Sequence, residues 1–169
     1  MLSLRFWPRA TEKCPPRLPW RQIAAAFCGA ALAIAVLAQL QSWQHISLIL
    51  GSFGASCLLV FAYPLSPFAQ PRNLIGGHAV SSLTGLVVMS LCGVHPWSMA
   101  LAVGTAVALM LVLRVPHPPA GSNPLIVMIS GAGWEFLLTP TLAGAVLLAI
   151  VAFGYHNGVL KQRYPSYWW

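Results

Sequence analysis

Long runs of apolar residues, each close to the length of a bilayer crossing, restrict most strongly what this chain can fold into. Clear examples are residues 23–40, 74–94 and 136–155. A helix needs roughly 20 apolar residues to cross a hydrocarbon core of about 30 Å. Only 7% of the 169 residues are charged and 58% are hydrophobic, whereas a soluble domain carries about 25% charged residues. The sequence therefore predicts an all-α, polytopic transmembrane helical bundle surrounded by membrane lipid.

Prolines, glycines and polar residues divide the apolar sequence into six expected membrane segments. They are residues 23–40, 46–63, 74–94, 98–113, 120–130 and 136–155. The fifth is short for a full crossing and fits a half-helix or a re-entrant segment. The first run is also compatible with a cleaved signal peptide, but it is long for that role and further runs follow it, which favours a retained helix.

The basic residues lie outside the apolar runs. Five of the nine Lys and Arg residues precede the first run, and Lys161 and Arg163 follow the last. With six crossings, Arg72 and Arg114 fall on the same side as these residues, and Glu135 alone falls on the other, as the positive-inside rule requires. A nucleic-acid partner is not expected, because no polar domain carries a basic surface.

The predicted organisation has three parts. Residues 1–21 form a basic cytoplasmic leader, residues 22–157 a transmembrane domain, and residues 158–169 a cytoplasmic tail rich in aromatic and basic residues. Aromatic side chains favour the membrane interface, so Tyr164, Tyr167 and Trp168 are expected there. His45, His95 and His156 lie at predicted helix ends and are also expected at the interface.

Enzymatic chemistry has few candidate residues. Glu12 and Glu135 are the two carboxylates, and both lie near segment ends, so no acid–base pair is apparent. The serines lack a G-x-S-x-G setting. The four cysteines and five histidines show no metal-binding spacing. We therefore expect no catalytic residues, no metal and no cofactor.

Two short polar segments open membrane runs from the same side. Residues 71–78 and 116–123 can be aligned at an offset of 45, and each has a proline, a glycine five residues later and then a polar side chain, His78 or Asn123. Only the proline and glycine are identical among the eight positions, so chance and duplication both stay open. Four prolines in residues 116–124 break any helix. Such a break suits a wet cavity within the protein, although a plain cytoplasmic turn is an alternative.

These segments resemble the HPP family of integral membrane proteins. The similarity is carried by Arg114-Val-Pro-His117-Pro118-Pro119-Ala-Gly121 and by Gln70-Pro71-Arg72-Asn73-Leu-Ile-Gly76-Gly77-His78. It extends over about residues 21–155. The resemblance implies four or more transmembrane helices and transport of small solutes; plant relatives in the chloroplast envelope are implicated in nitrite uptake. The appended cystathionine-β-synthase-type domains of some relatives and a transit peptide are not seen here, so a bacterial inner membrane is expected.

The residues themselves also favour an anion. Helices beginning near Asn73 and Pro118 would direct free N–H groups and a partial positive charge toward one side. Arg72 adds charge there, or merely obeys the positive-inside rule; Arg114 snorkels to the headgroups or contributes in the same way. His78 and Asn123 are expected to meet across a central cavity. The predicted substrate-binding residues are Arg72, Asn73, Gly76, Gly77, His78, His117, Pro118, Pro119, Gly121, Ser122 and Asn123.

The sequence thus favours a transporter or channel for a small inorganic anion, with nitrite suggested by the resemblance. The alternative is a membrane scaffold or assembly subunit without transport activity of its own. A cation is disfavoured because no acidic residue lies within a run. Small residues around Gly51, Gly54 and Gly104 predict close helix packing. A homo-oligomer fits the thin wall that six short helices would make.

Overall fold

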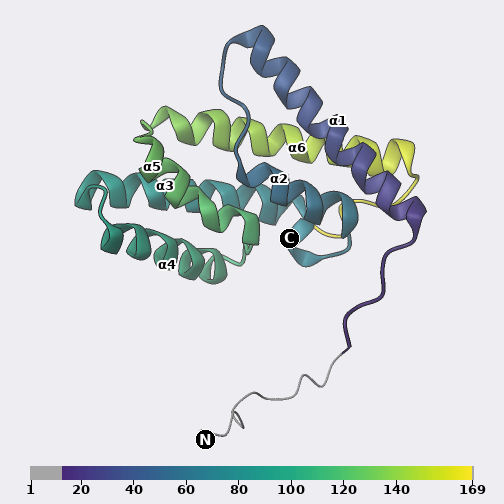
Figure 1. The fold of residues 1–169 in the computed structure, drawn as a ribbon, viewed down its shortest axis with the longest axis horizontal. Coiled ribbons are helices and arrows are strands. Elements are labelled where there is room, and N and C mark those ends of the chain that lie inside the picture. Colours follow the sequence, from purple (N-terminus) through teal and green to yellow (C-terminus); the bar gives the residue numbers. More distant parts are fainter. Residues whose placement is uncertain (1–12, 169) are drawn as a thin grey trace, which may run out of the picture.

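The computed structural model describes residues 13–168 of the chain. Within these residues all regular structure is helical, which confirms the predicted all-α class. Figure 1 shows the arrangement of the helices. Their bounds are α1 Trp20–Gln44, α2 Ser52–Cys57, η1 Leu58–Ala62, η2 Pro67–Ala69, α3 Pro71–Cys92, α4 Pro96–Val112, η3 Pro118–Ser122, α5 Asn123–Ser130, η4 Leu137–Leu142, α6 Ala143–Phe153 and η5 Gly154–Val159.

Three of the helical segments are long and apolar enough to cross a membrane. They are α1, α3 and the segment Leu137–Val159, which consists of η4, α6 and η5 and is kinked at Thr139. Two shorter apolar helices, Ser52–Ala62 and Pro96–Val112, accompany them. Since a soluble fold could not leave so much of these helices exposed as apolar surface, the chain is a polytopic membrane protein.

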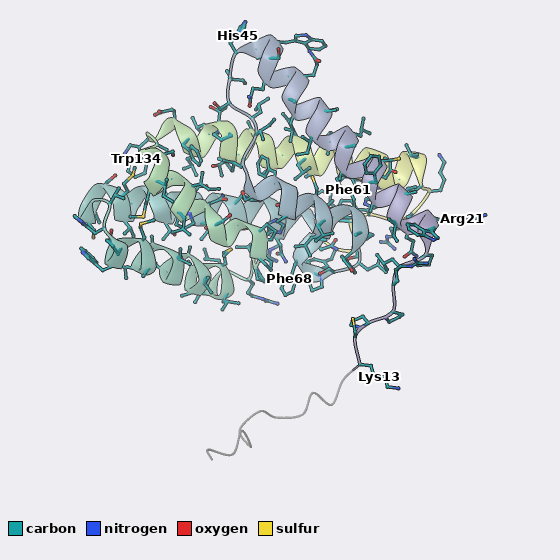
Figure 2. The ribbon with its side chains drawn as sticks, in the orientation of Figure 1. Lys13, Arg21, His45, Phe61, Phe68 and Trp134 are labelled. Atoms are coloured by element: carbon teal, nitrogen blue, oxygen red, sulfur yellow. The ribbon has the colours of Figure 1, made fainter. Side chains whose placement is uncertain are left out.

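Helix α3 lies at the centre of the bundle. It packs against α4, α5 and α6 and against the short η2, η3 and η4 segments. The buried side of this helix includes the polar residues Asn73, His78, Ser81 and Ser82. In contrast, α1 leans away from the other helices toward its end at His45 (Figure 2).

The fifth segment is short, as the sequence predicted. Helix α5 has 8 residues, which corresponds to about 12 Å and less than half of a hydrocarbon core. It is preceded by the 3₁₀ turns of η3 and ends at Gly131, whose φ of 62° and ψ of 36° give the left-handed cap that glycine adopts readily.

The second segment differs from the predicted helix over residues 46–63. The helix begins only at Ser52, and the residues before it run without helical hydrogen bonds. The side-chain oxygen of Gln41 accepts from the backbone N–H of Leu48 at 2.9 Å and of Ile49 at 3.3 Å. A Cβ at Gly144 would lie only 2.4 Å from the Leu48 carbonyl oxygen. Non-helical backbone is thus packed against protein and given a polar partner, which is the condition for it inside a membrane.

Within the described chain, the glycines of the predicted small-residue faces are not at close helix contacts, although Ser56, Cys57 and Ala106 beside them are buried. A Cβ at Gly51, Gly54 or Gly104 would meet no atom within 4 Å. The close approaches occur elsewhere: a Cβ at Gly29 would lie 2.4 Å from the Phe61 ring, and one at Gly85 would lie 2.7 Å from Pro124 Cα. Small residues also surround Gly29 and Gly85, so a small-residue pattern alone does not tell which glycine lies at a close contact.

The C-terminal tail folds back onto the bundle. Tyr164 is 1% exposed, and its hydroxyl donates to the carbonyl of Ala69 at 2.7 Å. Burial raises the pKa of the Tyr164 phenol, which keeps it a donor. The expectation that Tyr164 lies at the membrane interface is therefore wrong, whereas Trp168 is 54% exposed.

His156 is likewise buried. Its side chain is fully enclosed, its Nε2 lies 3.0 Å from the carbonyl oxygen of Val60, and its ring stacks on Phe61. The expected interfacial position is wrong for His156, while His45 and His95 are exposed. His156 packs the end of η5 against η1.

Candidate functional site

The two proline-initiated segments lie side by side, with η3 and α5 following α3 in the same direction. A Cβ at Gly76 would lie 2.9 Å from Val115, one at Gly77 would lie 2.6 Å from His117 Cβ, and one at Gly85 would contact Pro124. The Ser81 hydroxyl donates to the Ala120 carbonyl at 2.6 Å. Both segments therefore begin at the same end of the bundle.

His78 and Asn123, which the sequence predicted would meet, are in direct contact. Asn123 Nδ2 lies 2.9 Å from His78 Nδ1. Both side chains are 0% exposed. The meeting point is therefore a sealed part of the interior, not the wet cavity that the sequence predicted.

A continuous set of hydrogen bonds extends from this pair, and we call it the interior network. Ser56 Oγ lies 3.0 Å from His78 Nε2 and 2.8 Å from His117 Nε2. Ser82 Oγ accepts from Asn123 Nδ2 at 2.9 Å and lies 2.9 Å from Thr141 Oγ1. Ser52 Oγ donates to Asn123 Oδ1 at 2.7 Å. The members are Ser52, Ser56, His78, Ser82, His117, Asn123 and Thr141, and none is more than 5% exposed.

The partners of His78 and His117 determine which ring nitrogen carries the hydrogen in the neutral state. His117 Nδ1 lies 2.7 Å from the carbonyl oxygen of Phe68, which can only accept, so Nδ1 carries the hydrogen and Nε2 accepts from Ser56. His78 Nδ1 accepts from the Asn123 amide, so its Nε2–H donates to Ser56 Oγ. Ser56 thus bridges His78 and His117, and each polar side-chain atom of these three residues has a hydrogen-bond partner. Polar groups buried in a membrane require such partners.

A cleft that contains the predicted site residue Arg72 together with Arg114 lies where α3 begins and α4 ends, and we call it the arginine cleft. It has a volume of about 480 Å³ and is lined by Pro67, Arg72, Asn73, Leu111, Arg114, Pro116 and Tyr167. Arg72 Nη2 donates to the carbonyl of Leu113 at 3.5 Å, and Arg114 is exposed. No carboxylate is among the lining residues, so the cleft is electropositive.

Asn73 connects the arginine cleft to the tail. Its Nδ2 donates to Pro67 O at 2.7 Å and to the Tyr167 hydroxyl at 3.3 Å. The side chain is 2% exposed, and its Oδ1 has no hydrogen-bond partner in the structure. Pro116 of the lining is followed directly by His117, so the arginine cleft adjoins the interior network.

A second cleft lies where α5 ends, and we call it the Glu135 cleft. It has a volume of about 320 Å³, and its lining includes Gly51, Glu135 and Pro140. Ser52 and Thr141 of the interior network follow Gly51 and Pro140 directly in the chain. In Figure 2, Trp134 marks this end of the bundle, away from Phe68. The network thus lies between two clefts.

Several predicted site residues belong neither to the interior network nor to the lining of the arginine cleft. Pro118 and Ser122 are exposed, and the Ser122 hydroxyl donates to the Pro119 carbonyl at 2.9 Å. A Cβ at Gly121 would meet nothing within 4 Å. Gly76 and Gly77 allow the 115–117 backbone to pack on α3, a role in helix packing that the sequence analysis did not assign to them.

The second predicted helix N-terminus offers fewer donors than expected. Pro118 and Pro119 have no N–H, and the N–H of Ala120 donates to the His117 carbonyl at 3.0 Å. An anion approaching η3 therefore meets no free backbone donor at its first three positions. The positive charge in this region comes from side chains.

Four members of the network were missed by sequence analysis: Ser52, Ser56, Ser82 and Thr141. The small-residue pattern around Gly51 and Gly54 assigns Ser56 to helix packing and gives Ser52 no role. Their spacing of four residues places both hydroxyls on one helix face, and two hydroxyls on one face of an apolar segment need polar partners. That spacing is a weak signal, because serine in an apolar helix usually bonds its own backbone.

Comparison with known proteins identifies the family. The model of the HPP transmembrane region matches residues 15–165. Two proteins of Dictyostelium discoideum, both described as transmembrane proteins, are each 33% identical over 170 residues, covering 94% of this chain and 60% and 55% of their own lengths. No solved structure matches the chain. The chain belongs to the HPP transmembrane family and spans little more than half the length of these relatives.

Proposed function

We propose that this member of the HPP transmembrane family transports a small inorganic anion across a membrane, with nitrite as the first candidate. We place it in a bacterial inner membrane with both termini in the cytoplasm, where the positive-inside rule puts the arginine cleft. The observation that carries the proposal is the arginine cleft, which adjoins a sealed hydrogen-bonding network in the interior.

The arginine cleft supplies attraction for an anion. Arg72 and Arg114 both line its volume of about 480 Å³. Clefts lined by one sign of charge concentrate ions of the opposite sign and raise their rate of arrival about 10-fold to 10³-fold. A cation would be repelled there, because the only carboxylate side chain in the described residues, Glu135, lines the other cleft.

The interior network supplies groups that can replace water around a small oxyanion. The amide of Asn123, the Nε2–H of His78 and the hydroxyls of Ser52 and Ser56 are donors within one cluster. An oxyanion such as nitrite has only acceptor atoms, so it can take these donors one after another. Because the donors now serve each other, anion passage exchanges internal hydrogen bonds for bonds to the anion.

The test is anion uptake by the purified protein in liposomes. Nitrite, nitrate, formate and chloride are supplied outside, and uptake is compared with that of protein-free vesicles. We expect nitrite to enter fastest and the double variant Arg72→Gln/Arg114→Gln to lower the initial rate about tenfold at subsaturating anion. Arg163→Gln removes an equal charge outside the arginine cleft and should have little effect.

Two results would overturn the proposal. The first is wild-type uptake no faster than that of protein-free vesicles for all four anions. The second is an unchanged rate in the double arginine variant when the Arg163→Gln control shows normal assembly, because the arginine cleft would then have no part in transport.

A further inference from the structure

We infer that His117 and Ser56 form a binding site for one proton, and that the transported anion crosses the membrane together with this proton. The inference rests on the proposed function and adds the coupling ion to it. It is carried by the geometry of the His78–Ser56–His117 bridge and by the distribution of charge around it.

One lone pair of the bridge, that of His117 Nε2, can be released for a proton because the hydroxyl that donates to it can rotate. His117 Nε2 is 2.8 Å from Ser56 Oγ and accepts its hydrogen, whereas the lone pair of His78 Nδ1 is occupied by Asn123 Nδ2. A proton delivered from water therefore binds at His117 Nε2. One N–H bond forms there, one O–H bond of the hydronium donor breaks, and the network gains a charge of +1.

Ser56 can satisfy both protonation states. In the neutral state its hydroxyl donates to His117 Nε2. When Nε2 carries a proton, the new N–H donates to Ser56 Oγ, and the Ser56 hydrogen turns to the carbonyl oxygen of Ser52, which lies 3.2 Å away. The hydroxyl thus acts as a switch, and protonation leaves no buried donor without an acceptor.

The site holds a single proton. The rings of His78 and His117 have their centroids 5.0 Å apart, and two positive charges at this separation in a sealed interior repel each other strongly. Protonation of one imidazole therefore excludes protonation of the other, which predicts one proton for each anion.

The surroundings provide no fixed negative charge to balance that proton. The titratable or charged groups on neighbouring elements are the buried thiol of Cys57 on α2 and the guanidinium groups of Arg72 and Arg114 at the arginine cleft. Glu135 lines the opposite cleft. Since a charge inside a membrane needs a partner, an anion entering from the arginine cleft favours proton binding, and the proton favours anion binding in return.

The experiment measures anion and proton movement together in proteoliposomes. A pH-sensitive dye is trapped inside, nitrite is added outside, and protein-free vesicles correct for nitrous acid that crosses lipid unaided. We expect internal acidification to accompany nitrite uptake with a ratio of about one proton per anion. The uptake rate should rise as the external pH falls, and a membrane potential set with potassium and valinomycin should leave it unchanged.

Three variants test the named atoms. His117→Gln keeps a hydrogen-bonding side chain that cannot take up a proton at neutral pH, so the residual uptake should lose its dependence on external pH. Ser56→Ala should lower uptake about tenfold because the protonated imidazole loses its acceptor, and Ser56→Thr should restore it. Ser81→Ala removes a buried hydroxyl of α3 that lies off the bridge, and it should keep coupled uptake.

The outcomes separate this inference from the proposed function. Protein-dependent nitrite uptake without acidification, or a His117→Gln variant with the wild-type pH dependence, overturns the proton site and leaves anion transport standing. If none of the four anions enters faster than in protein-free vesicles, the proposed function is overturned first. If His117→Gln does not assemble, the comparison of Ser56→Ala with Ser56→Thr decides the role of the bridge.

Discussion

Asn123 Nδ2 lies 2.9 Å from His78 Nδ1, although the two residues are 45 positions apart. They are also the last residues of the two similar eight-residue segments, 71–78 and 116–123. The segments run side by side from one end of the bundle, and the pair joins them in its sealed interior. Removing either side chain should therefore disturb the packing of α3 against α5 as well as the interior network.

Close packing of α3 against the residues before η3 should make Gly77 sensitive to substitution. In Gly77→Ala the new Cβ would lie 2.6 Å from His117 Cβ, whereas in Gly54→Ala it would meet nothing within 4 Å. We expect Gly77→Ala to lower the free energy of unfolding by about 1–3 kcal/mol, and Gly54→Ala to be neutral or slightly stabilising. Thermal unfolding in detergent measures both, and equal stability of the two variants would contradict the packing described here.

Loss of the Ser82 hydroxyl should lower the free energy of unfolding more than loss of the Thr141 hydroxyl to which it bonds. The Ser82 hydroxyl bonds to both Asn123 and Thr141, whereas the Thr141 hydroxyl bonds to Ser82. Ser82→Ala leaves a buried amide hydrogen without an acceptor and should cost about 1 kcal/mol more than the nearly isosteric Thr141→Val. Unfolding of the single and double variants gives the coupling between the sites, and a larger effect of Thr141→Val would show that the amide does not depend on Ser82.

The folded-back tail predicts a stabilising role for Tyr164. In Tyr164→Phe the carbonyl of Ala69 loses a 2.7 Å hydrogen bond, so we expect a loss of about 1 kcal/mol in unfolding free energy. Tyr63 is 49% exposed, and Tyr63→Phe is the matched control with little expected change. If both variants unfold alike, the tail does not stabilise the bundle through this bond.

The two clefts should open to opposite sides of the membrane. Single cysteines at Arg72, Arg114 and Glu135 can be labelled with an impermeant maleimide in a variant without the native Cys14, Cys28, Cys57 and Cys92. We expect Arg72→Cys and Arg114→Cys to react in inverted vesicles and Glu135→Cys in intact cells, following the positive-inside rule. Reaction of Arg72→Cys and Arg114→Cys from different sides would contradict the shared arginine cleft.

Helix positions followed from the sequence where burial in lipid decides the structure. The runs at residues 74–94 and 98–113 correspond closely to α3 and α4, because a backbone in hydrocarbon must bond to itself. The run at residues 46–63 does not correspond to one helix, because the helix begins only at Ser52. Apolar composition does not distinguish a helix from extended backbone. The Gln41 side chain accepts a hydrogen bond from the backbone N–H of Leu48, seven residues later, and so stabilises the extended backbone. No local sequence pattern indicates this contact.

Part of the candidate site could be predicted from the sequence where charge or proline marked it. Arg72, Arg114, His78, His117 and Asn123 stood out because such residues are costly or disruptive in a membrane. Ser56 did not, since serine in an apolar helix usually bonds its own backbone. Only the packing of three separate segments reveals that Ser56 bridges two imidazoles.

The enclosure of the interior network also bears on how flux would depend on concentration. An ion cannot diffuse through side chains that are 0% exposed, so each passage would wait for the helices to part and close again. Uptake should then level off at high anion concentration and rise steeply with temperature. An open pore would instead give a current that grows in proportion to the driving force.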